Sequence, residues 1–137
     1  MVKYYLDTCI WIDFFEDRKG SKGEPFGEFA SRLLTKIQKE NNQIMLSDHL
    51  LNEFKRGFSL SSILHILDSL QIEMEGFSYS ISQDAEAQRL AKDKNVPFED
   101  ALHAILARDS NAILVTRDKH FKKLSSVSNP FKPETLI

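Results

Sequence analysis

The sequence predicts an α/β fold, a three-layer sandwich in which a central, mainly parallel sheet carries helices on both faces. Short apolar runs alternate along the chain with longer segments whose apolar residues recur at helical spacing. Parallel strands are buried on both faces and therefore read as continuous apolar runs, and the helices that connect them cover the sheet. The length of 137 residues suits a single domain over 1–137 with one core.

The first part of the chain predicts a strand, a helix, a loop and a second helix. Val2–Leu6 is a short, β-prone apolar run and is interpreted as a buried strand. Thr8–Glu16 is so densely apolar that it fits either a strand or a short helix, and we interpret it as a helix. Asp17–Pro25 contains two glycines, a proline and three basic residues, which indicates a loop. Helical spacing then predicts an amphipathic helix over Pro25–Glu40.

The middle of the chain repeats this alternation. Gln43–Leu46 is a second short apolar strand, and Ser47 is a suitable N-cap for a helix over Asp48–Arg56. Aliphatic residues in helical register predict another helix over Leu60–Leu70. Ile72–Phe77 is interpreted as a link or a weak strand.

The last part predicts two helices, the strongest strand and a short helix. Ser80 begins a pattern typical of a capping box before a helix over Gln83–Asp93. A proline, two early acids and a run of alanine and aliphatic residues predict a helix over Phe98–Arg108. Ala112–Val115 is the strongest strand, and a short helix around His120–Leu124 and a proline-containing tail follow it.

Composition limits the class of protein. Lysine and arginine number 18 and aspartate and glutamate 20, so the net charge of −2 argues against a strongly basic nucleic-acid coat. It does not exclude a nucleic-acid enzyme whose acidic centre binds metal ions. No apolar run is long enough to cross a bilayer, and the first acid comes too early for a signal peptide. The single cysteine, Cys9, cannot form an internal disulfide, so we expect a cytoplasmic protein.

Four carboxylates from distant segments lie after predicted strands or early in predicted helices. Asp7 directly follows the first strand, and Glu53 lies on the helix after the second. Asp100 lies in the first turn of its helix, and Asp118 follows the last strong strand after two residues. Ligands of parallel sheets bind at the carboxyl ends of the strands, so these acids can meet at one edge. Each also has a simpler interpretation, as a helix cap, a solvated side chain, a first-turn acid or a turn residue.

A cluster of carboxylates is unfavourable unless a cation neutralises it, because neighbouring acids raise one another's pKa. Oxygen ligands select hard ions such as Mg²⁺ or Mn²⁺. Such an ion keeps positions free for water and phosphate oxygens, which is the chemistry of phosphodiester hydrolysis. No nucleophile-elbow, P-loop or dinucleotide-binding motif supports a serine hydrolase or a nucleotide-dependent enzyme.

Four segments around these acids carry a more specific signal. They are LDTCIWID at 6–13, LLNEF at 50–54, PFEDALHAILA at 97–107 and LVTRDKHF at 114–121. In these segments, and in their order along nearly the whole chain, the sequence resembles PIN-domain ribonucleases. The branch that it resembles most is the small prokaryotic type that includes the VapC toxins of toxin–antitoxin pairs.

The resemblance implies an acidic metal site with two hydroxyls beside it. The residues that match the acids are Asp7, Glu53, Asp100 and Asp118. Thr116 matches a family hydroxyl position beside the site, and Thr8 is the supporting hydroxyl next to the first acid. It also implies a Mg²⁺- or Mn²⁺-dependent endoribonuclease that leaves a 5′-phosphate and a 3′-hydroxyl, and a homodimer. For the toxin type it implies a cognate antitoxin. His120 stands where many members carry another acid, so the number of ions stays open.

Basic residues and histidines near the acids have two interpretations each. The basic residues can hold the RNA backbone or be solvated surface charges; they are Lys55, Arg56, Arg117 and Lys119. The four histidines include no His-x-x-x-His pair, and His103 is interpreted as a packed or hydrogen-bonded histidine rather than a ligand.

The expected function is a metal-dependent endoribonuclease that is the toxin of a toxin–antitoxin pair. One alternative is a PIN-domain RNA processing or decay nuclease without an antitoxin. Another is a catalytically inert module that binds RNA or a protein in a groove at these acidic residues. A phosphatase or a structure-specific DNA nuclease uses the same metal chemistry and is the remaining class.

Overall fold

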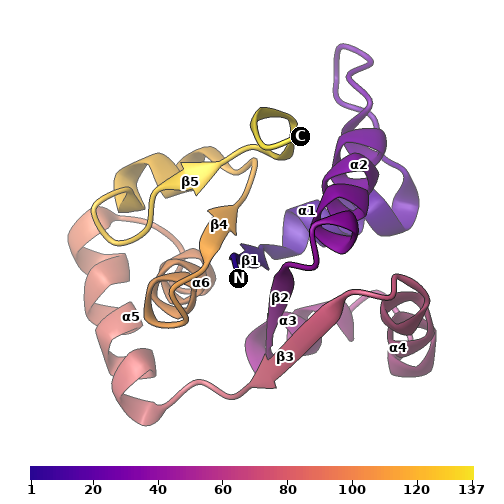
Figure 1. Ribbon diagram of the computed structural model, residues 1–137. Helices are drawn as coiled ribbons and strands as arrows, with labels where there is room; N and C mark the ends of the chain where they lie inside the picture. Colours follow the sequence, from indigo (N-terminus) through magenta and orange to yellow (C-terminus); the bar gives the residue numbers. More distant parts are fainter.

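The computed structural model describes residues 1–137, and its centre is one five-stranded sheet (Figure 1). The strand order is β3-β2-β1-β4-β5, and every neighbouring pair is parallel. The strands are β1 (Lys3–Leu6), β2 (Gln43–Ser47), β3 (Glu73–Phe77), β4 (Ile113–Val115) and β5 (Pro130–Phe131). Because all strands run the same way, their carboxyl ends lie at a single edge of the sheet.

Helices cover both faces of the sheet, which confirms the predicted three-layer sandwich. They are α1 (Thr8–Glu16), α2 (Phe26–Lys39), α3 (Asp48–Phe54), α4 (Leu60–Ser69), α5 (Ile81–Lys94), α6 (Phe98–Asp109) and the short 3₁₀ helices η1 (Lys119–Leu124) and η2 (Pro133–Thr135). The pair α5 and α6 packs on one face, and the pair α1 and α2 lies on the other (Figure 1). No helix is both long and apolar enough to span a membrane.

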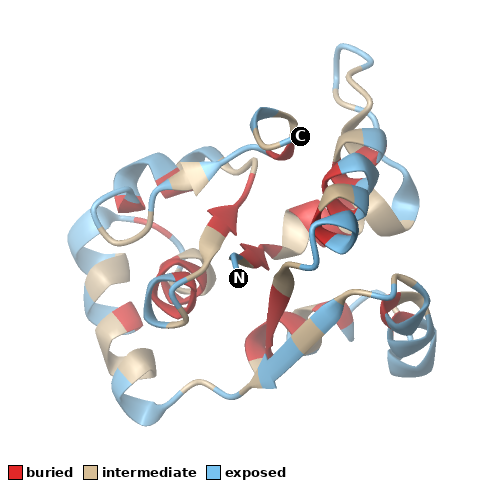
Figure 2. Ribbon diagram, in the orientation of Figure 1, coloured by how far each residue is buried: buried red, intermediate tan, exposed pale blue.

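The core lies around the middle strands and α6. Figure 2 shows β1, β2, β4 and α6 mostly as buried elements. Seven consecutive residues of α6, Ala101–Ala107, are buried. A helix that is apolar on all sides fits only between two packed layers, and α6 lies between the sheet and α5. This burial fixes the first turn of α6, which carries Asp100.

The structure refines several predicted boundaries. The helix α3 ends at Phe54, two residues before the predicted end. The capping box is present, but Ser80 is the N-cap itself and α5 begins at Ile81 rather than Gln83. The segment interpreted as a link or weak strand forms β3 at one end of the sheet. The two-residue strand β5 was not predicted, because it is too short to show a pattern and contains a proline, which only edge strands tolerate.

Candidate metal centre

Asp7 lies where β1 ends and where α1 begins. It is the N-cap of α1, and its Oδ1 accepts a hydrogen bond from the backbone N–H of Ile10. The same oxygen accepts from the thiol of Cys9 at 2.8 Å, and Oδ2 accepts from the hydroxyl of Thr116 at 2.5 Å. The side chain is buried. Asp7 therefore caps α1, as one interpretation of the sequence held, while its carboxylate stays at the carboxyl edge of the sheet.

Asp100 and Asp118 form a cluster with His120. His120 Nδ1 lies 3.0 Å from Asp100 Oδ2 and 3.2 Å from Asp118 Oδ1. One donor atom from each of the three residues lies within 4.8 Å of the others. The hydroxyl of Thr116 accepts a hydrogen bond from the backbone N–H of Asp118 at 3.1 Å. Because the same hydroxyl donates to Asp7, Thr116 connects the first acid to this cluster.

The surroundings of Asp7 and Asp100 disfavour the charged forms of these two acids. Burial, followed by the charge of Asp118 and a further contribution from Asp7, raises the pKa of Asp100 from 3.8 to about 6. Burial also raises the pKa of Asp7. Crowded carboxylates are relieved by a cation, and a set of carboxylate oxygens suits a hard divalent ion. The residues present therefore fit Mg²⁺ or Mn²⁺.

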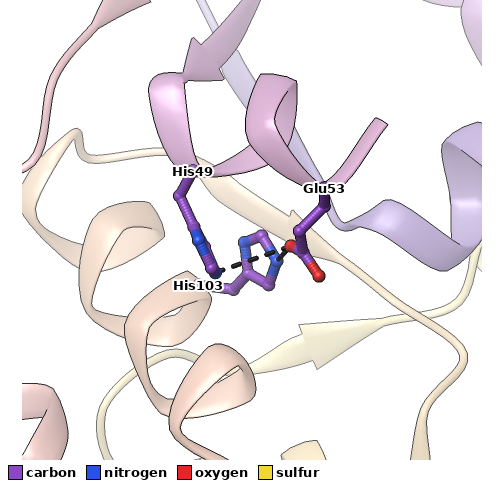
Figure 3. Close-up of side chains that lie close together, drawn as sticks. All are labelled: His49, Glu53 and His103. Atoms are coloured by element: carbon purple, nitrogen blue, oxygen red, sulfur yellow. Dashed lines mark hydrogen bonds and ion pairs between the residues drawn. The ribbon is translucent and has the colours of Figure 1, made fainter. Parts of the chain in front are cut away.

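Glu53 belongs to a second, neighbouring cluster. Its Oε1 accepts a hydrogen bond from the Thr8 hydroxyl at 2.8 Å, lies 2.5 Å from His103 Nε2 and lies 3.5 Å from His49 Nε2 (Figure 3). Burial alone would raise the pKa of Glu53, but the hydrogen bond and charge of His103, with the Thr8 hydrogen bond, bring it below its usual value. The charge of His103 also lowers the pKa of Asp7, so His103 acts on both carboxylates.

The histidine cluster includes residues that the sequence analysis did not single out. The Tyr5 hydroxyl lies 2.7 Å from His103 Nδ1 and 2.8 Å from Ser47 Oγ. His103 is buried and hydrogen-bonded, as the sequence predicted, and its Nε2 atom faces Glu53. A signal for His49 was present, because it precedes Glu53 by four residues on a predicted helix and shares its face.

The basic residues fall into two groups. Lys55 and Arg56 are exposed in the turn after α3, and Lys119 is exposed next to Asp118. Arg117 differs, because its guanidinium donates two hydrogen bonds of 2.8 Å to the carboxylate of Glu134 and its side chain is 13% exposed. The charge of Arg117 is therefore used within the chain, and we leave it out of the RNA contacts proposed below.

Comparison with known proteins identifies the family. The family model described as PIN domain matches residues 4–127, and the chain belongs to that family. PIN domains are nucleases, so the predicted family and enzyme class are confirmed at this level. No curated protein sequence matches the chain.

Solved structures share the fold at low sequence identity. VapBC2 from Rickettsia felis, bound to a DNA fragment from its promoter, has a TM-score of 0.67 and 21% identity, covering 96% of this chain and 98% of that one. A toxin–antitoxin complex from Klebsiella pneumoniae has a TM-score of 0.62 and 18% identity, covering 95% and 97%. PAE2754 from Pyrobaculum aerophilum has a TM-score of 0.57 and 16% identity, covering 98% and 86%.

Proposed function

We propose that the protein is a metal-dependent endoribonuclease that acts as the toxin of a toxin–antitoxin pair. The observation that carries the proposal is the pairing of Asp100 with Asp118 beside Asp7, at the carboxyl edge of a PIN-domain sheet. The raised pKa of Asp100 supports a cation at this place, because the site holds more negative charge than it can stabilise alone.

The residues of the site have distinct proposed roles. Asp7, Asp100 and Asp118 hold Mg²⁺ or Mn²⁺, and Glu53 completes the shell directly or through water. When bound, the ion supplies the positive charge that activates water and stabilises the phosphate oxygens. Thr116 fixes the carboxylate of Asp7 through its hydrogen bond. Glu53 orients the attacking water.

The substrate and partners follow from the family and from exposed charge. Lys55, Arg56 and Lys119 contact the RNA backbone, because exposed cations beside an acidic centre can hold the phosphates. Two of the similar structures are described as VapBC2 and as a toxin–antitoxin complex, which supports a cognate antitoxin that covers the acidic groove. We further propose a homodimer in the cytoplasm.

Cleavage assays on matched substrates test the proposed activity. The purified protein is incubated with single-stranded RNA, single-stranded DNA and a flap DNA, each with Mg²⁺ or with EDTA. We expect cleavage of RNA only, and only with Mg²⁺. Asp7→Asn should lower the rate at least about a hundredfold, because it removes a charge from the ion's shell. Glu99→Gln, in the same helix turn as Asp100, is the control for charge loss outside the site and should cut normally.

A growth assay tests the toxin role separately. Induction of the wild-type chain should arrest growth, and co-expression of the product of a short neighbouring gene should restore it. Mg²⁺-dependent RNA cleavage without growth arrest would instead favour an RNA processing or decay nuclease. If wild-type protein cuts no RNA and Asp7→Asn behaves identically, the inert binding module is the better account.

A further inference from the structure

The cluster of His49, Glu53 and His103 is compact and mostly enclosed (Figure 3). His49 and Glu53 lie one helical turn apart on α3, and His103 comes from α6, so the cluster joins two elements (Figure 3). The donor atoms, two imidazole Nε2 atoms and one carboxylate oxygen, all lie within 4.8 Å of one another. The side chains of His49, Glu53 and His103 are 9%, 15% and 3% exposed, so water reaches the cluster mainly from the side of Glu53.

One atom of the cluster lacks a hydrogen-bond partner. The Nε2 atom of His49 is buried and makes no hydrogen bond. It faces Glu53 Oε1 at 3.5 Å, which is too long for a good hydrogen bond. Buried polar atoms are nearly always paired in folded proteins, so an unpaired ring nitrogen that faces a carboxylate is a candidate metal donor.

We propose that His49, Glu53 and His103 bind a divalent transition metal ion of borderline softness, represented by Zn²⁺, at a second site that adjoins the acidic centre and shares Glu53 with it. Two imidazoles and one carboxylate are a donor set of transition metals rather than of Mg²⁺, which prefers oxygen. Three protein ligands leave a fourth position open. The Thr8 hydroxyl lies 2.8 Å from Glu53 Oε1 and 3.4 Å from His103 Nε2, so it neighbours two of the three donor atoms.

Two of the three donor separations lie within about 1 Å of those in a zinc site. In a tetrahedral zinc site, bond lengths near 2.0–2.1 Å put neighbouring donor atoms about 3.3 Å apart. The separation of His49 Nε2 and Glu53 Oε1 is already 3.5 Å. The His103 Nε2 to Glu53 Oε1 separation is 2.5 Å, so a side-chain shift of less than about 1 Å would be needed.

The ring of His103 is already held at its other nitrogen, as the rings of metal-binding histidines usually are. His103 Nδ1 lies 2.7 Å from the Tyr5 hydroxyl, which in turn lies 2.8 Å from Ser47 Oγ. The backbone and the charge of Glu99 act on the imidazole of His49 and favour its charged form, although burial lowers the pKa of His49 overall. A bound ion would cross-link α3 to α6.

Cobalt binding by the full chain tests the site. Metal-free protein is titrated with Co²⁺ while its visible absorption is followed, because nitrogen-containing four-coordinate sites absorb far more strongly than six-coordinate oxygen sites. We expect one strongly absorbing Co²⁺ per chain, displaced by Zn²⁺, and a higher Tm when Zn²⁺ is bound. His49→Ala should weaken binding at least about tenfold and remove the Tm increase.

Three control variants separate this site from the acidic centre. Asp118→Asn and His120→Ala alter only the other cluster, and His65→Ala removes an exposed histidine of α4; all three should keep the strong absorption. Loss of absorption in Asp118→Asn or His120→Ala, with His49→Ala unaffected, would overturn the proposal. The absence of strong absorption in the wild-type chain would also overturn the proposal, and that result does not depend on whether any variant folds. Because the readout is metal binding without RNA, failure here leaves the nuclease proposal standing.

Discussion

Asp100 is a carboxyl that the folded protein prefers to keep protonated. Its pKa is about 6 in the fold against an ordinary value of 3.8, mainly because of burial and the charge of Asp118. Between these two pH values the folded state holds a proton that the unfolded state has released. The contribution of Asp100 to the free energy of unfolding is therefore greatest below about pH 4, and it is lost as the pH rises through 6. A bound cation would reverse the effect.

Asp100→Asn should accordingly stabilise the metal-free protein at neutral pH. In EDTA at pH 7.5 we expect the free energy of unfolding to rise by about 3 kcal/mol, since the pKa shift from 3.8 to about 6 corresponds to about 1.4 kcal/mol per unit. The gain should shrink towards zero near pH 4. Urea denaturation at several pH values measures it, with Glu99→Gln as the control. A destabilised Asp100→Asn at pH 7.5 would contradict the electrostatic account of the site.

Tyr5 contributes through a single buried hydroxyl. Tyr5→Phe removes the group that contacts both His103 and Ser47, leaving buried polar atoms with one partner fewer. We expect a loss of about 1–2 kcal/mol in the free energy of unfolding, measured by urea denaturation. Tyr79→Phe is the matched control, because the Tyr79 side chain is not part of this network. Equal stability of Tyr5→Phe and the wild type would show that the hydroxyl has no structural role.

At the scale of elements, Arg117 ties the end of β4 to three other segments. Its guanidinium pairs with Glu134 of η2, lies 3.6 Å from Asp13 of α1 and stacks at 3.9 Å over the ring of Phe26 in α2. Arg117→Ala should therefore lower the free energy of unfolding by about 3 kcal/mol, because it leaves partly buried acids unpaired. Urea denaturation measures the change. Lys119→Ala, which changes an exposed residue two positions further along the chain, should change the free energy of unfolding little. A similar loss in both variants would show that the contacts of Arg117 do not stabilise the fold.

Sequence patterns predicted most elements because each had its own local signal. Ser80 and Gln83 marked the start of α5, and the apolar run after Asp100 marked α6. The pairing of Pro130–Phe131 beside β4 depends on contacts far along the chain, which no local pattern carries. For the candidate site, position after a strand singled out Asp7 and Asp118, and position in the first turn of a helix singled out Asp100. Position in the sequence could not indicate that Glu53 faces two histidines, or that Arg117 forms an ion pair with Glu134, because both contacts depend on tertiary packing.

At the scale of the whole molecule, a net charge of −2 requires that RNA be held by a few local cations. In an Asp7→Asn background, replacing both Lys55 and Arg56 with alanine should reduce the slope of log K against log salt by about 1.4 for single-stranded RNA. Fluorescence anisotropy at several salt concentrations measures this slope. The double alanine variant of Lys92 and Lys94, on exposed positions of α5, is the control. Equal slopes in both variants would remove Lys55 and Arg56 from the RNA contacts.

The central claim is that acids from distant segments jointly hold one divalent ion, and calorimetric titration with Mn²⁺ tests it most directly. The wild type and the three single variants Asp7→Asn, Asp100→Asn and Asp118→Asn are compared at pH 7.5, with Glu99→Gln as the control. We predict that each of the three weakens Mn²⁺ binding at least about tenfold while the control binds as the wild type does. Wild-type affinity in all three variants would contradict the claim.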